Sequence, residues 1–310
     1  MNSARLASVV LALVTALPVH AGLLSLCEPA QEQAFENALR TAIFTEYRDN
    51  YFITGLPQAG DHPRNFVRFQ LSVKYNLVPT TSRCTLYFAY TQKSLWNLWN
   101  FSGSSPFEDS NYNPAFFFAW TNQDFGTYHS VPSAGFNLLY IHTGYEHESN
   151  GRDKEASRGW ERLSSTARFG WYLKGEWHLL VQPRLWVPWV SGRETEGGGN
   201  PDLIDYYGYG SLSLELGKDQ HPDGYAHAVG TPAWRDFMVG VMGRAGRRFD
   251  RGYAELWARY RLPFETVSWS LYAQFVTGYG ETLLRYNQKV TAFRVGIALD
   301  DRFSWNAAIR

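Results

Sequence analysis

The sequence predicts an all-β protein, a twelve-stranded antiparallel transmembrane β-barrel, from three observations. Apolar and polar side chains alternate at strand period along many segments, for example 67–75 and 254–262. Aromatic residues make up 16% of the chain, with 12 Trp and 19 Tyr. After the first residues, no apolar run is long enough to cross a bilayer as a helix. A barrel in lipid combines these features, because its strands are polar toward the lumen and its rims are aromatic.

The strand-like segments are even in number, as closure of a bacterial barrel requires. Most of them reach the ~9–11 residues that a tilted strand needs to cross the hydrocarbon layer. Longer links containing Gly, Asp and Pro lie near 100–113, 191–203 and 217–235. The strands are predicted near 50–56, 65–78, 83–98, 114–122, 136–149, 159–173, 176–189, 204–216, 236–245, 251–262, 267–279 and 289–301.

The two ends of the chain differ from the predicted barrel. Residues 1–21 read as a secretory signal peptide, with Arg5 before an apolar run and Ala21 at the expected cleavage point. Residues 22–48 are a mixed, partly helical stretch that we interpret as an N-terminal periplasmic lead-in. The barrel domain then covers 49–303, and 304–310 form a C-terminal overhang. An exported barrel of this kind is expected in the outer membrane as a multi-pass protein.

Composition narrows the classes of partner. The 29 acidic residues balance the 29 Lys and Arg, so nothing favours nucleic acid. Cys27 and Cys84 are too few for a disulfide framework, although they could pair in an oxidising compartment.

One hairpin, from Leu138 to Trp171, carries a constellation typical of catalysis. Side chains two apart on a strand share a face. His147 and Ser149 should therefore lie on one apolar face, and Glu161 should meet them from the returning strand. A hydroxyl, an imidazole to take its proton and a carboxylate to orient the imidazole make an activated serine. Because the trio lies on the apolar face, a hydrolase built this way should act on lipid. The same face is predicted to hold Leu139, Ile141, Tyr145, Leu163, Ala167, Phe169 and Trp171, and the opposite face Tyr140, His142, Glu146, Arg162, Ser164, Thr166 and Arg168.

Four stretches, one of them within this hairpin, make the sequence specific. They are 90–96 (Tyr-Thr-Gln-Lys-Ser-Leu-Trp), 104–107 (Ser-Ser-Pro-Phe) with 111–114 (Asn-Tyr-Asn-Pro), 147–152 (His-Glu-Ser-Asn-Gly-Arg) with Ser157, Arg158 and Trp160, and 278–287 (Gly-Tyr-Gly-Glu-Thr-Leu-Leu-Arg-Tyr-Asn). The sequence resembles the outer-membrane phospholipase A family, whose members are calcium-dependent enzymes built as twelve-stranded barrels. The resemblance implies hydrolysis of acyl esters in glycerophospholipids and lysophospholipids, at either acyl position.

Family roles transfer residue by residue. Ser149 matches the nucleophile, His147 the general base and the Gly151 N–H an oxyanion donor. The resemblance also implies three Ca²⁺ ligands: the Arg152 carbonyl, the Ser157 hydroxyl, and the Ser104 carbonyl from a second subunit. The complete calcium site would then require a homodimer. Gln92 matches a polar residue buried in that dimer interface, but on a strand it could equally face the lumen.

The sequence departs from the family at two positions. Glu161 stands where the family typically has Asn. Gly199 stands where an acidic residue is associated with a second calcium site, which is therefore in doubt, although Asp202 is close by.

Simpler readings compete with several of these assignments. Ser104 could be an ordinary turn residue, and Trp96, Trp99 and Trp160 are most simply residues of an aromatic belt. For the whole chain, the alternatives are a lipid A deacylase, another outer-membrane barrel that uses His, Ser and Glu, and a non-catalytic porin-like barrel.

Overall fold

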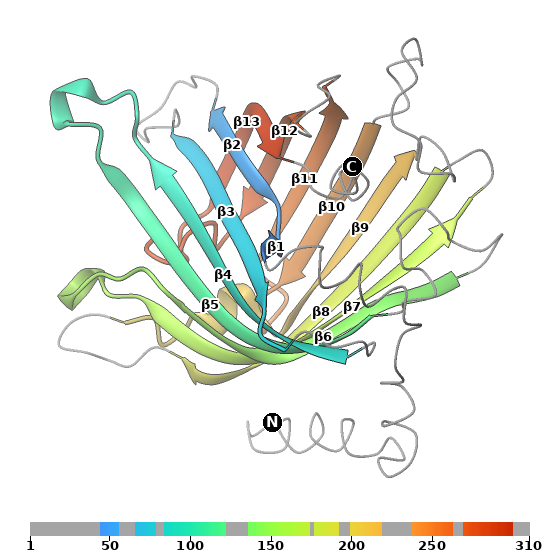
Figure 1. Ribbon diagram of the computed structural model, residues 1–310. Helices are drawn as coiled ribbons and strands as arrows, with labels where there is room; N and C mark the ends of the chain where they lie inside the picture. The colour runs from blue at the N-terminus through green and yellow to red at the C-terminus, as the bar shows by residue number, and fades with distance from the viewer. Residues whose placement is uncertain are drawn as a thin grey trace.

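Twelve antiparallel strands form a closed barrel in the computed structural model (Figure 1). The structure describes residues 44–55, 66–78, 84–121, 136–173, 177–191, 199–218, 237–262 and 269–299. From β2 to β13 each strand pairs with the next one in the chain, and β13 pairs with β2 to close the ring. This up-and-down order joins neighbours by hairpins and leaves no free sheet edge. The predicted fold class is confirmed.

The observed strands follow most of the predicted ranges. They are β2 (Asn50–Gly55), β3 (Val67–Asn76), β4 (Cys84–Trp96), β5 (Phe107–Thr121), β6 (Phe136–Ser149), β7 (Gly159–Tyr172), β8 (Trp177–Ser191), β9 (Gly210–Lys218), β10 (Phe237–Ala245), β11 (Gly252–Arg261), β12 (Trp269–Gly278) and β13 (Val290–Leu299). A short strand β1 (Phe44–Glu46) also pairs with β3, ahead of residue 49, where we placed the start of the barrel.

Two strand starts differ from the prediction. β5 begins at Phe107 rather than near 114, because the polar side chains of Asp109 and Asn111 are buried inside the barrel mouth instead of forming a surface link. β9 begins at Gly210 rather than 204, because residues 204–207 form the short helix α4 (Ile204–Tyr207). Asn and Asp are usually depleted in strands and Tyr is enriched in them, so residue type alone misplaces both boundaries.

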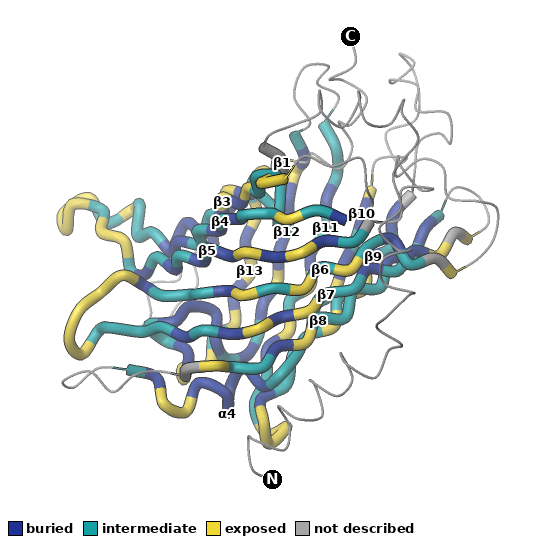
Figure 2. The backbone as a smooth tube through the Cα atoms, turned by 60° about the horizontal axis from the view of Figure 1, so that its bottom comes forward, coloured by how far each residue is buried: buried dark blue, intermediate teal, exposed yellow. Residues whose placement is uncertain are grey.

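The outer wall of the barrel is apolar. Buried and exposed residues alternate along the strands (Figure 2), and large apolar side chains point outward, including Phe116 at 50% exposure and Leu256 at 53%. The face assignment was wrong for Leu139. The β6–β7 ladder shifts register between Leu138 and Tyr140, and this bulge turns Leu139 inward against Gly170.

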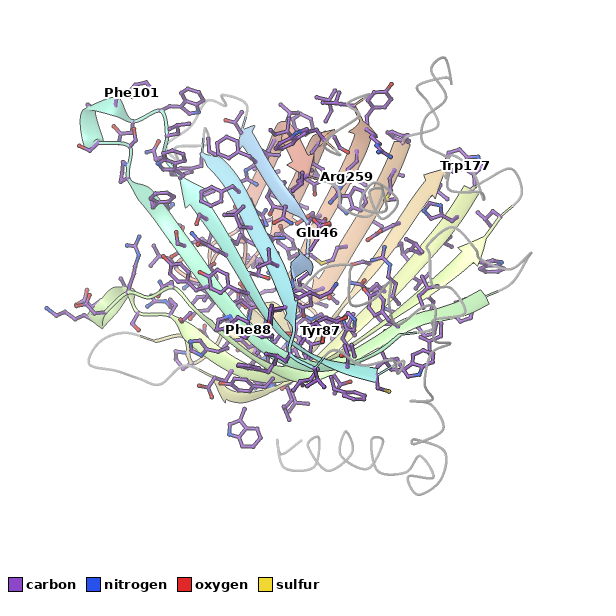
Figure 3. The ribbon with its side chains drawn as sticks, in the orientation of Figure 1. Glu46, Tyr87, Phe88, Phe101, Trp177 and Arg259 are labelled. Atoms are coloured by element: carbon purple, nitrogen blue, oxygen red, sulfur yellow. The ribbon has the colours of Figure 1, made fainter. Side chains whose placement is uncertain are left out.

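The interior is packed with charged and polar side chains rather than left as an open channel. Glu146 forms ion pairs with Arg162 (2.7 Å), Arg48 (3.1 Å) and Arg184. Arg259 is 1% exposed and lies inside the barrel (Figure 3). Buried charges of both signs compensate one another, which is the condition for burying them at all.

An apolar cluster closes the barrel end that carries the β6–β7 turn. It joins residues of β7 and β8 to helix α4 and to the β12–β13 loop (279–289). Trp160 is 3% exposed inside this cluster, so its expected place in an outer aromatic belt was wrong. Its members are Trp160, Trp186, Leu203, Ile204, Tyr206, Tyr207, Leu283 and Tyr286.

Several predicted features lie outside the described residues: the signal peptide (1–21), most of the lead-in (22–43) and the overhang (304–310). Cys84, the first residue of β4, is disulfide-bonded, and Cys27 lies outside the described residues. Among the described helices, none is long and apolar enough to cross a membrane.

Candidate active site

His147 and Ser149 lie at the end of β6, on the outer wall of the barrel. The His147 Nε2 atom is 3.0 Å from Ser149 Oγ, which is hydrogen-bonding distance. Because the two residues alternate with the inward-pointing Glu146 and Glu148, the strand period alone places them side by side. The arrangement lets the imidazole take the hydroxyl proton.

Glu161 reaches the same site from β7, where it pairs with His147 in the ladder. Its Oε1 atom lies 3.7 Å from His147 Nδ1. This is ion-pair distance but longer than a hydrogen bond. The neighbouring β7–β8 ladder shifts register between Glu161 and Arg162, opposite Pro188. The structure therefore brings the three predicted residues together, with the carboxylate in the looser contact.

Two glycines create space around Ser149. Gly151 has a φ of +63°, and a Cβ there would meet the Tyr112 ring at 3.2 Å. Among the described residues, no acceptor binds the Gly151 N–H. Gly159 lies opposite Ser149 in the ladder, and a Cβ on it would lie 3.3 Å from Ser149 Cβ. A bulkier residue at 159 would thus crowd the Ser149 side chain.

The turn after Ser149 is held by Asn150, which is 4% exposed. Its side chain donates to the Ala156 carbonyl (2.8 Å) and accepts from the Arg158 N–H (2.9 Å). The Arg152 guanidinium donates to the Glu108 carbonyl (2.6 Å) on β5. These bonds fix the turn and expose its remaining backbone groups. Beside it is a depression of about 330 Å³ lined by Gln92, Phe107, Ser110, Tyr112, Asn150, Gly151 and Arg152.

The candidate calcium ligands are all neutral oxygens. Among the described residues, no hydrogen bond involves these three oxygens: Ser157 Oγ, the Arg152 carbonyl and the Ser104 carbonyl. Ser104 has a left-handed backbone (φ 60°) in the exposed β4–β5 connection, where Phe101 projects at the tip (Figure 3). Oxygen is the donor that Ca²⁺ prefers, although it takes 6–8 of them. Across the described residues no cluster of three acidic, His or Cys side chains offers a metal site. The donor chemistry fits calcium only if water or another subunit completes the shell.

The two positions connected with a second calcium site have other contacts. The Gly199 N–H donates to the Ser157 carbonyl (3.1 Å), and Asp202 accepts a hydrogen bond from the Tyr286 hydroxyl. Beside them, the buried Asn200 accepts from the Gly159 N–H (2.9 Å). This segment thus supports the catalytic turn from behind, and Asp202 is engaged with the apolar cluster.

Gln92 points outward from β4, not into the lumen. Its amide donates to Ser94 Oγ (3.1 Å), and Ser94 bonds Ser110 on β5 (2.8 Å). A polar cluster on an otherwise apolar wall is unfavourable in lipid. This position is compatible with burial against another protein surface.

Sequence reasoning missed the residues behind the site. Asn113 donates from its side chain to the His147 carbonyl (2.6 Å), and Glu148 accepts from Trp160 Nε1 (3.1 Å) and Arg162 (2.8 Å). The sequence signal for the Glu148–Arg162 ion pair was that Glu146 and Glu148 alternate with the outward-facing residues of the strand. For Asn113 the signal was the neighbouring Pro114, which cannot donate to a ladder.

A His–Ser pair facing outward from a closed, polar-filled barrel is the arrangement expected of a barrel hydrolase that acts at its outer wall. The family model of phospholipase A1 matches residues 31–299, and the chain belongs to this family. It is therefore a phospholipase, which excludes the porin-like alternative.

The relatives agree in sequence and in structure. Phospholipase A1 of Escherichia coli K12 is 34% identical over 239 residues, which are 76% of this chain and 70% of that protein. Outer membrane phospholipase A from E. coli matches with a TM-score of 0.64 at 28% identity, covering 87% of this chain and 98% of that one. The Salmonella typhi outer membrane phospholipase dimer with bound calcium matches with a TM-score of 0.63 at 29% identity over the same shares.

Proposed function

We propose that this chain is a calcium-dependent outer-membrane phospholipase that hydrolyses acyl esters of glycerophospholipids and lysophospholipids. The observation that carries the proposal is the 3.0 Å contact between His147 Nε2 and Ser149 Oγ on the apolar outer wall. A nucleophile in that position meets the acyl ester of a lipid without the lipid leaving the bilayer. Family membership favours this substrate class over lipid A.

The reaction starts with proton transfer from Ser149 Oγ to His147 Nε2. The oxygen attacks the ester carbonyl carbon and forms a tetrahedral oxyanion. The imidazolium then returns the proton to the leaving alcohol, so a lysophospholipid departs and an acyl-serine remains. Water, deprotonated by the same imidazole, attacks the acyl-serine carbonyl. The bond to Ser149 Oγ then breaks, the imidazolium returns the proton to that oxygen, and the fatty acid departs. His147 thus serves as base and acid in turn.

Two further residues act on the charges that develop. The free N–H of Gly151 would donate to the oxyanion, and one such donor is typically worth ~3–4 kcal/mol of transition-state stabilisation. Glu161 would stabilise the imidazolium from the Nδ1 side, across the 3.7 Å observed. A modest closure of that gap would make a charge-assisted hydrogen bond.

Calcium would be held by the Arg152 carbonyl, the Ser157 hydroxyl and the Ser104 carbonyl of a second subunit. Bound there, it would supply positive charge beside the oxyanion. Because the three donors are neutral, the site should bind calcium weakly. Because one of the donors comes from a second subunit, calcium binding should favour the homodimer. The outward cluster of Gln92, Ser94 and Ser110 supports an interface on this wall.

The decisive experiment measures fatty-acid release by the purified, detergent-solubilised protein. Ser149→Ala should lower the rate of fatty-acid release by several orders of magnitude, while the heat-modifiable gel mobility of the folded barrel persists. Ser165→Ala, which removes an outward hydroxyl on β7 away from the site, is the control. A Ser149→Ala variant with near-normal rates would refute the nucleophile assignment.

A further inference from the structure

The ladder between β5 and β6 is interrupted beside the catalytic histidine. Pairing runs from Thr121↔Tyr140 to Ala115↔Glu146 and resumes only at Tyr112↔Ser149. The register is the same on both sides of the gap, so Pro114 lies opposite His147. On its other side Pro114 remains in register with Tyr90 of β4. The break thus concerns only the link to the catalytic strand.

Pro114 explains the interruption. Proline has no N–H and removes a ladder hydrogen bond from a sheet. The His147 carbonyl, which points toward β5, therefore finds no backbone donor on the residue opposite. Asn113 supplies one instead, since its Nδ2 lies 2.6 Å from the His147 oxygen.

The Asn113 side chain is built into this position. It is 3% exposed on the inner side of β5, and within the described part of the chain its Oδ1 has no hydrogen-bond partner. Among the described residues, its bond to His147 is therefore the contact that fixes the amide. The neighbouring Asn111, on the same face, instead bonds Asp109 (2.7 Å) and the Leu283 N–H (3.0 Å). Two similar residues thus serve different partners.

We infer that Asn113 is a positioning residue, which replaces the ladder bond lost at Pro114 and so fixes the backbone of His147 against Ser149. The inference rests on the proposed function of His147 as the base. Without this bond, the His147 carbonyl would lose its partner on β5, and this end of β6 would be held mainly by the β7 ladder, in which His147 lies opposite Glu161. The 3.0 Å contact with Ser149 depends on that peptide, because His147 and Ser149 are two residues apart on one strand.

The test is a double-mutant cycle with Pro114→Ala, which returns an N–H opposite His147. Asn113→Ala should lower kcat by about ten- to a hundredfold, the loss caused by a displacement of about 1 Å, with KM little changed. Labelling of Ser149 by a fluorophosphonate should slow in parallel. The double variant should recover to within about threefold of Pro114→Ala alone, because the two sites act on one bond.

Controls separate positioning from general damage. Asn111→Ala should destabilise the barrel mouth. Any loss of kcat that it causes should not be rescued by Pro114→Ala. If Asn113→Ala does not fold, Asn113→Ser, whose hydroxyl is too short to reach His147, replaces it and should lose kcat similarly. Wild-type kcat in the folded Asn113 variant, or a loss that Pro114→Ala leaves uncorrected, overturns the inference. Activity persisting in Ser149→Ala would instead overturn the proposed function and remove His147's role with it.

Discussion

At the scale of single residues, Glu161 is the position where this chain departs from its family's usual asparagine. Its side chain is 36% exposed and lies 3.7 Å from His147 Nδ1. A carboxylate can stabilise the imidazolium more than an amide can, but burying its charge costs free energy unless it is hydrogen-bonded. The partial exposure and the looser contact are consistent with that compromise. Glu also carries one more methylene than Asn, and the β7–β8 register shifts directly beside it.

We therefore expect graded losses at this position. Glu161→Ala should lower kcat by ~10²-fold or more, within the range that acid–base catalysis contributes. Glu161→Gln should cost less, since it keeps a group that can orient the ring. The comparison uses Ala, Gln and Asn variants at saturating calcium, with Glu155→Gln as an exposed control in the same hairpin. Equal rates for wild type and Glu161→Ala would make Glu161 a bystander and the enzyme a Ser–His dyad.

At the scale of elements, the sequence predicted the strands far better than the connections. Alternation placed His147, Ser149 and Glu161 correctly, because strand period depends only on local sequence. It failed at Leu139, where a bulge reverses the faces. Trp160 was misplaced for another reason: its residue type suggested an outer aromatic belt, whereas its position next to the outward Glu161 places it inward. Bulges and register breaks depend on partner strands, so a single strand's pattern cannot locate them. The side-chain hydrogen bonds of Asn113, Asn150 and Asn200 also depend on partners in other segments, so the sequence pattern did not predict them.

The β12–β13 loop shows how a connection can be tied to the barrel interior. Glu281 in this loop forms ion pairs with Arg294 (2.6 Å) and Arg68 (3.3 Å) and is almost fully buried. Burial alone would raise the pKa of the Glu281 carboxyl, but Arg294 and then Arg68 outweigh it, and the net pKa lies below the usual value. A depressed carboxyl pKa stabilises the fold above the unfolded-state value of ~4.3. That stability is lost as the pH falls through the folded-state pKa.

Glu281→Gln should therefore destabilise the protein at pH 7 by ~3–5 kcal/mol, the cost of leaving buried partners uncompensated. The difference from wild type should begin to shrink below the unfolded-state pKa of ~4.3 and disappear as the pH falls through the depressed folded-state pKa, where the wild-type carboxyl also becomes neutral. The measurement is the midpoint of heat modification over a pH series. Asp250→Asn, which breaks the exposed pair with Arg251 (3.9 Å), is the control and should change little. A pH-independent difference would contradict the ion-pair explanation.

At the scale of the whole molecule, the barrel separates its tasks by face. The interior carries the ion pairs, the outer wall carries the His–Ser pair, and the closed end supports the catalytic turn through Gly199 and Asn200. No described cluster of acidic or His side chains completes a metal site within one chain. In the proposed site, a single copy would supply neutral oxygens for part of a calcium shell. A second copy is the simplest source of the rest, and mass action would then link calcium, assembly and activity.

We expect activity and dimer content to rise together with calcium. Ser157→Ala, which removes the one side-chain ligand, should raise the calcium concentration needed for half-maximal activity by about tenfold or more, a cost typical even of residues that only support a metal ligand. Excess calcium should restore both its rate and its cross-linked dimer. Ser165→Ala, an outward hydroxyl away from the turn, should titrate like wild type. The measurement pairs fatty-acid release with cross-linking across a calcium series in detergent. Full activity in a monomeric, chelator-treated preparation would separate catalysis from assembly, and the Ser104 carbonyl would then have no role across subunits.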